Sequence, residues 1–136
     1  MKTTRESAFT LIELMVVVII IAALAGMVLP RLWTRGDDAK MKIAEGEIAG
    51  IKTALKCYYL DNGKFPTKDE GLNALMRKPP SAKDWKGPYL ESEPFDPWDR
   101  PYQYTYPGVH NVGFLDIWSF GPNEEDNSDN VTNWKE

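Results

Sequence analysis

Apolar residues gather near the N-terminal end of the chain. Residues 14–29 read LMVVVIIIAALAGMVL and carry no charged or hydrogen-bonding side chain, and only Thr10 and Glu13 interrupt the apolar run back to Phe9. At a rise of about 1.5 Å per residue, an α-helix of this length spans roughly 30 Å, the thickness of the hydrocarbon core of a bilayer. A chain this short has too little interior to surround a helix that is apolar on all sides. We therefore predict a transmembrane helix over residues 9–30.

A second apolar pattern follows, now with the spacing of one helix face. Along residues 31–62 the apolar positions recur at steps of three and four: Met41, Ala44, Ile48, Ile51, Leu55 and Tyr58. This spacing predicts an amphipathic helix, which Asn62 and Gly63 end because glycine readily adopts a positive φ angle. Between the two stretches, Gly26 lowers helix propensity and Pro30 removes a backbone donor. This junction is expected either to kink passively or to lose helical structure.

Residues 63–136 have the pattern of a small α+β head. Residues 69–77 are expected to form a short helix. Residues 102–106 alternate like a strand, and residues 113–120 are expected to pair with them across a turn. The predicted fold class is therefore α+β: a long N-terminal helix, transmembrane and then amphipathic, packed on a small antiparallel β-sheet head.

Composition and charge exclude several function classes. The 136 residues have room for one domain of ordinary size, and 16 Lys and Arg against 20 Asp and Glu give a net charge of -4. That balance argues against a nucleic-acid partner, which would require a basic surface. Cys57 and His110 are each alone of their kind in the sequence, so a disulfide, a zinc site or a catalytic triad would lack partners. We expect no enzymatic activity.

Glu13 is the one charged residue within the apolar run. A carboxylate costs on the order of 2.5 kcal/mol or more near the centre of a bilayer. Either Glu13 reaches the membrane interface, or it pairs with a positive charge at the same depth. Cleavage just before Phe9 would create such a charge, because the new α-amine would lie one helical turn away or in a neighbouring molecule.

Residues 8–17, AFTLIELMVV, resemble the leader junction of type IV pilins and of type II secretion pseudopilins, where a prepilin peptidase cuts before the Phe and methylates its amine. Ala8 departs from the glycine that the family normally has there, which bears on the efficiency of processing. Five further blocks resemble the major pseudopilins of type II secretion systems, in the same order: YLDNGKFPT at 59–67, EGLNAL at 70–75, WKGPYL at 85–90, DPWDRPYQY at 96–104 and DIWSFG at 116–121.

The resemblance implies a prepilin with a leader at residues 1–8, cleavage between Ala8 and Phe9, and N-methylation of Phe9. The subunit would be anchored once in the inner membrane, with its N-terminus cytoplasmic and its head periplasmic. It would then polymerise into a periplasmic pseudopilus that drives export of folded proteins across the outer membrane. The implied partners are further copies, minor pseudopilins, the inner-membrane assembly platform, prepilin peptidase and, before assembly, the lipid bilayer.

Two residue roles and one alternative accompany that resemblance. In the filament, Glu13 would neutralise the Phe9 amine of an adjacent subunit, and the helix would lose structure between Gly26 and Pro30. The alternative is a type IV pilin for adhesion or DNA uptake. Such pilins commonly carry a C-terminal disulfide loop, for which this sequence lacks a second cysteine.

The C-terminal loop at residues 121–131 concentrates oxygen ligands. Its composition suits calcium, which takes six to eight oxygens, although an acidic surface loop is the other interpretation. The resemblance implies one calcium ion, with these candidate ligands: the carbonyls of Phe120 and Val131 and the side chains of Asn123, Asp126, Asp129 and Asn130. Asn123 replaces a usual Asp and lowers the charge of the site. We therefore expect either weaker affinity or a loop held by hydrogen bonds alone.

Overall fold

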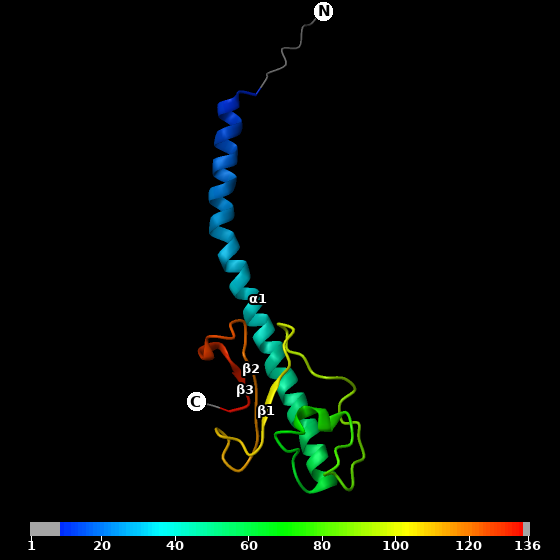
Figure 1. Ribbon diagram of the computed structural model, residues 1–136. Coiled ribbons are helices and arrows are strands. Elements are labelled where there is room, and N and C mark those ends of the chain that lie inside the picture. Colours follow the sequence, from blue (N-terminus) through cyan, green and yellow to red (C-terminus); the bar gives the residue numbers. More distant parts are fainter. Residues whose placement is uncertain (1–8, 135–136) are drawn as a thin grey trace, which may run out of the picture. The chain divides into compact units, whose positions relative to one another are not determined.

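The computed structural model describes residues 9–134, except for the side chains of residues 28–35 (Figure 1). The elements are, in chain order, α1 (Leu11–Asn62), a 3₁₀ helix (Gly71–Leu75), β1 (Gln103–Thr105), β2 (Asp116–Ser119), a second 3₁₀ helix (Asn127–Asp129) and β3 (Val131–Thr132). The chain divides into two compact units, Met1–Gly36 and Asp37–Glu136. The predicted leader at residues 1–8 lies outside the described residues.

The first unit contains the N-terminal part of α1. The backbone is helical through both Gly26 and Pro30, so the subunit does not show the loss of helix predicted there for assembled subunits. Among the residues that the structure describes, no helix is both long enough and apolar enough to cross a membrane. The predicted transmembrane range 9–30 continues into residues 28–35, whose side chains lie outside the description, and it stays a prediction.

The second unit confirms the predicted amphipathic helix and its sheet. The apolar face of α1 is buried at Ala44, Ile48, Ile51, Leu55 and Tyr58. In Figure 1 the three strands lie beside the cyan-to-green part of α1. Their order is β1-β2-β3, and both pairs are antiparallel. The predicted pairing of β1 with β2 is correct. The sequence did not predict β3, because two residues are too short to show an alternating pattern.

Tyrosine hydroxyls fix the head to the helix at polar points within this unit. Tyr102 is buried, and its hydroxyl donates to the carboxylate of Glu47 at 2.5 Å. The hydroxyl of Tyr89 donates to Asp61 at 2.7 Å. Burial is the main reason that the pKa of Tyr102 is raised, and the Glu47 carboxylate raises it further. These side chains therefore remain neutral donors at any physiological pH.

Glycine determines where the helices of this unit end or begin. α1 ends at Asn62, and Gly63 follows with φ +71°, as predicted. The predicted helix over residues 69–77 is wrong in extent and type, because the structure has a 3₁₀ helix over Gly71–Leu75. Gly71 has φ +57°, a left-handed conformation that cannot belong to a continuous right-handed helix beginning at residue 69.

Candidate functional site

The N-terminus of α1 is closed by three hydrogen bonds between Thr10 and Glu13. The Glu13 carboxylate accepts from the Thr10 backbone N–H at 2.9 Å and from the Thr10 hydroxyl at 3.0 Å. In return, the Glu13 backbone N–H donates to the Thr10 hydroxyl at 3.3 Å. This arrangement is a capping box, which satisfies backbone donors that the first helical turn leaves free. Glu13 therefore has a role within its own subunit that the sequence analysis missed.

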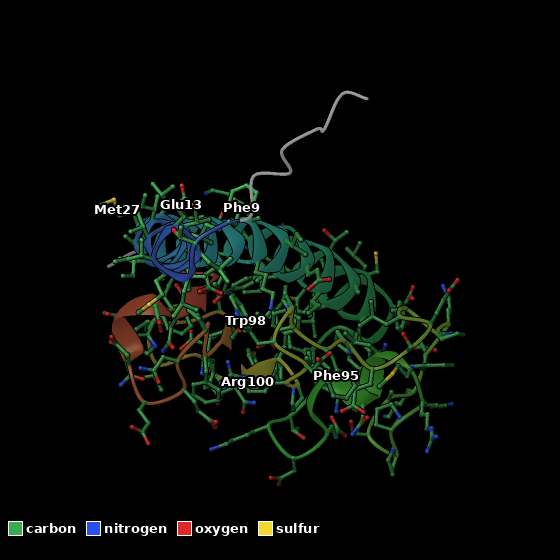
Figure 2. The ribbon with its side chains drawn as sticks, turned by 90° about the horizontal axis from the view of Figure 1, so that it is seen from above. Phe9, Glu13, Met27, Phe95, Trp98 and Arg100 are labelled. Carbon is green, nitrogen blue, oxygen red and sulfur yellow. The ribbon has the colours of Figure 1, made fainter. Side chains whose placement is uncertain are left out.

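The side chains around this cap are apolar and open to the surroundings. Phe9 is 90% exposed and Met27 is 73% exposed, and the apolar residues between them are exposed as well. Figure 2 labels Glu13 and Met27 on α1 and Phe9 just before it. Ala8, the other residue of the predicted cleavage site, lies outside the described residues, as does the side chain of Pro30. Gly26 lies within the helix with no atom near the position of a Cβ.

The predicted metal loop begins at Gly121, where the chain makes a sharp turn. Gly121 has φ +68°, and a Cβ there would collide with the carbonyl oxygen of Asp129. The two ends of the loop therefore meet at this glycine, and a larger residue would push them apart. The Gly121 N–H donates to the Ser119 hydroxyl at 3.1 Å, which in turn donates to the buried Asp96 carboxylate at 2.5 Å.

The side-chain oxygens predicted as metal ligands fall into two groups. Asn123 Oδ1 accepts from the Glu125 N–H at 3.2 Å, and Asp126 Oδ1 accepts from the Ser128 N–H at 2.9 Å. The two bonds from Ser128 lower the pKa of Asp126. In contrast, Oδ1 of Asp129 and Oδ1 of Asn130 are buried and have no hydrogen-bond partner among the described residues.

The burial of these two oxygens without a partner among the described residues fits a bound cation. A buried acceptor without a partner is costly unless an ion or water supplies the missing contact. Within the described part of the chain, no group of three or more His, Cys, Asp and Glu side chains is placed to hold a metal. A cation in this loop would therefore depend on amide and backbone oxygens as well as carboxylates. Calcium accepts such a donor set.

A second carboxylate, that of Asp116 at the start of β2, accepts hydrogen bonds from the turn at residues 109–111. It is 1% exposed and accepts from the backbone N–H groups of Val109, His110 and Asn111 at 2.8–2.9 Å. Burial disfavours its charged form, but the N–H donors of the turn more than offset that effect, so the pKa of Asp116 lies below its ordinary value. Sequence analysis missed this residue, since nothing in the local pattern showed which carboxylate would be buried.

His110 and Trp134 complete this turn and line a hollow beside it. Their rings are stacked with centroids 4.1 Å apart, and His110 Nδ1 lies 3.2 Å from Asp116. A cavity of about 610 Å³ is lined by these residues, by Trp118 and Phe120, and by loop residues including Asn130. His110 is thus engaged in structural contacts.

The matches to known proteins agree with this architecture. The family model described as type II secretion system (T2SS), protein G, matches residues 31–134. The chain belongs to the type II secretion system protein G family. A second model, the prokaryotic N-terminal methylation motif, matches residues 3–29. The chain is thus a structural pseudopilin with a prepilin-type N-terminus, a subunit of the pseudopilus used in protein secretion, and it is not an enzyme.

Individual members of the protein G family match along nearly the whole chain. The type II secretion system core protein G of Pseudomonas aeruginosa is 44% identical over 142 residues, covering 98% of this chain and 99% of the relative. That of Aeromonas hydrophila is 39% identical over 139 residues, covering 98% and 96%. The crystal structure of the major pseudopilin from enterohaemorrhagic Escherichia coli matches with a TM-score of 0.66 and 31% identity, covering 74% of this chain and 87% of that one.

Proposed function

We propose that the chain is processed between Ala8 and Phe9, is held in the inner membrane by residues 9–30, and then polymerises with further copies into a periplasmic filament. The observation that supports this most strongly is the exposure of the apolar side chains between Phe9 and Met27. Apolar surface of this extent requires cover from lipid or from other helices. Lipid supplies it before assembly, and the helices of neighbouring subunits supply it in the filament.

The finer partners and topology belong to the same proposal. Prepilin peptidase removes residues 1–8 and methylates Phe9, the N-terminus faces the cytoplasm, and the head faces the periplasm. Minor pseudopilins and the inner-membrane assembly platform are the remaining partners. As subunits leave the bilayer, the helix loosens between Gly26 and Pro30, the segment with the lowest helix propensity.

Glu13 sets the axial register of the filament by neutralising the Phe9 amine of an adjacent subunit. The capping box supports this role, because it holds the carboxylate next to the start of the mature chain. Glu13→Gln and Glu13→Ala separate the two functions of this side chain, since glutamine also closes a capping box whereas alanine does not.

The test measures leader cleavage and filament assembly for both variants. We expect both variants to be processed and both to assemble poorly. Without the Glu13 carboxylate, the Phe9 amine of the adjacent subunit would be an unpaired charge among packed helices, which is costly. If Glu13→Gln assembles like the original chain and only Glu13→Ala fails, Glu13 acts through its cap and the register role is wrong.

We also propose that residues 120–131 bind one calcium ion. The buried Oδ1 atoms of Asp129 and Asn130, which have no partner among the described residues, support this. The side chains of Asn123 and Asp126 and the carbonyls of Phe120 and Val131 would complete the ligand set. When bound, the ion would close the loop by drawing these oxygens together. Neutral Asn123 and Asn130 reduce the charge of the site, so we expect weak affinity.

Thermal unfolding of the full chain in detergent, with millimolar calcium or with a chelator, tests the site. A ligand that binds only the folded state raises the melting temperature. We expect a rise with calcium and a smaller one in Asp129→Asn. Equal melting temperatures in calcium and chelator would remove the metal and leave the filament role unchanged.

A further inference from the structure

Arg100 lies outside the loop of residues 121–131 in the sequence, yet its guanidinium contacts that loop at two points. Nη2 donates to the carbonyl oxygen of Gly121, the residue at which the loop closes. Nη1 lies 3.7 Å from the carboxylate of Glu124. The Arg100 side chain is 24% exposed, so these contacts form in a partly enclosed place. Figure 2 labels Arg100 among the side chains of the head.

The backbone that carries Arg100 is held firmly. The Arg100 N–H donates to Asp96 Oδ1 at 2.9 Å, and the Arg100 carbonyl accepts from the Asp96 N–H at 2.7 Å. The other oxygen of Asp96 accepts from Ser119, which accepts from the Gly121 N–H. The turn at residues 96–100 therefore fixes both backbone groups of Gly121: Asp96 acts through Ser119 on the N–H, and Arg100 binds the carbonyl.

The charge of Arg100 is only partly compensated where it lies. Its Nε is buried and has no hydrogen-bond partner among the described residues, and Glu124 is 65% exposed. The sequence of residues 121–131 contains four acidic residues, Glu124, Glu125, Asp126 and Asp129, and no basic one. A fixed positive charge beside this loop lowers the repulsion among its carboxylates and disfavours the approach of a divalent cation.

We propose that Arg100 is the resident cation of the loop. It holds residues 121–130 closed when no metal is bound, and it thereby reduces the stability that calcium adds. This inference rests on the calcium site proposed above. It assigns Arg100 as a positioning residue, acting through the Gly121 carbonyl, and it explains how the loop keeps its form with asparagine at two candidate ligand positions.

Melting temperatures of the full chain in detergent, with chelator and with millimolar calcium, test this role in Arg100→Gln, Arg100→Lys and the original chain. In chelator we expect Arg100→Gln to melt roughly 5 °C lower, since the loop loses its internal cation. In calcium, the difference in melting temperature between Arg100→Gln and the original chain should fall to less than half of that value. The ion stabilises the variant's loop more, because the Arg100 charge that repels it has been removed. Arg100→Lys retains the charge, so its calcium-induced rise should stay close to that of the original chain.

Lys86→Gln is the matched control, because Lys86 forms an ion pair of similar length with Asp61, at 3.6 Å, away from the loop. It should show no change in the calcium-induced rise. If calcium raises the melting temperature of the original chain, an equal deficit of Arg100→Gln in chelator and in calcium would overturn the inference. The absence of a deficit in chelator would overturn it in either case.

Amide hydrogen exchange in residues 122–130, measured in chelator, distinguishes this inference from the calcium site itself. If calcium raises the melting temperature of no variant, the calcium proposal fails. Faster exchange in Arg100→Gln than in Lys86→Gln would then still support Arg100 as the group that closes the loop. Equal exchange in the two variants would overturn that role.

Discussion

The two parts of α1 are both rich in apolar residues, but they differ in how far those residues are buried. Between residues 11 and 27 the apolar side chains face outward, with Ile12 71% and Ile19 64% exposed. Between residues 37 and 62 the chain buries one apolar face, and Leu55 and Tyr58 on that face are 0% exposed. The second part contributes to the stability of its own head. The first part leaves the apolar side chains of its described residues 11–27 uncovered.

The largest expected difference comes from deleting one apolar side chain in each part. Leu55→Ala should lower the free energy of unfolding of the head by about 2–5 kcal/mol, because it leaves a cavity in a closed core. Val17→Ala, at a position that is 49% exposed, should leave head unfolding unchanged. Urea unfolding of both variants in detergent, followed by tryptophan fluorescence, measures this. Equal losses in the two variants would contradict the comparison.

A second contrast concerns the two carboxylates that anchor local structure, Asp116 in the head and Glu13 at the helix start. Asp116→Asn should destabilise the head by about 3 kcal/mol near pH 7, since several N–H donors lose a charged acceptor. Glu13→Gln should leave head stability unaltered, because glutamine maintains the cap. Thermal unfolding of the two variants at pH 7 gives both values.

The pH dependence sharpens this contrast. The folded-state pKa of Asp116 lies below its ordinary value, so its contribution is complete above the unfolded-state pKa of about 3.9 and is lost as the pH falls through the folded-state pKa. The original chain should therefore lose stability as the pH falls below about 4, and Asp116→Asn should lose less. Parallel pH profiles for the two proteins would show that Asp116 does not carry this dependence.

The smallest expected effects come from one glycine in each part. Gly63 has φ +71°, so Gly63→Ala should lower the free energy of unfolding of the head by about 1 kcal/mol, and its melting temperature with it. Gly26 lies inside the helix with open space around it, so Gly26→Ala should increase helix stability by up to about 1 kcal/mol. Circular dichroism during heating measures both. If Gly26→Ala also hinders filament assembly, the proposed loosening of this segment gains support.

Much of this protein follows from local pattern. The apolar run that includes Phe9 to Leu29, the face from Ala44 to Tyr58 and the stop at Gly63 each depend on residues near one another in the chain. Periodicity and backbone preference act over a few residues, so sequence alone indicates them. The order of short motifs along the chain likewise indicates the pseudopilin family.

Only the tertiary structure decided which polar groups meet. Segments that the fold brings together determine the contact of Arg100 with Gly121, the burial of Asp116 and the burial of the Asp129 and Asn130 oxygens. Even the role of Glu13 in its own cap required the geometry of Thr10. The sequence by itself determined the long helix and the pairing of β1 with β2, because these depend on periodicity over neighbouring residues. It did not determine β3 or the extent of the 3₁₀ helix at Gly71–Leu75. Charge pairing and desolvation depend on distances across the fold, which no local pattern contains.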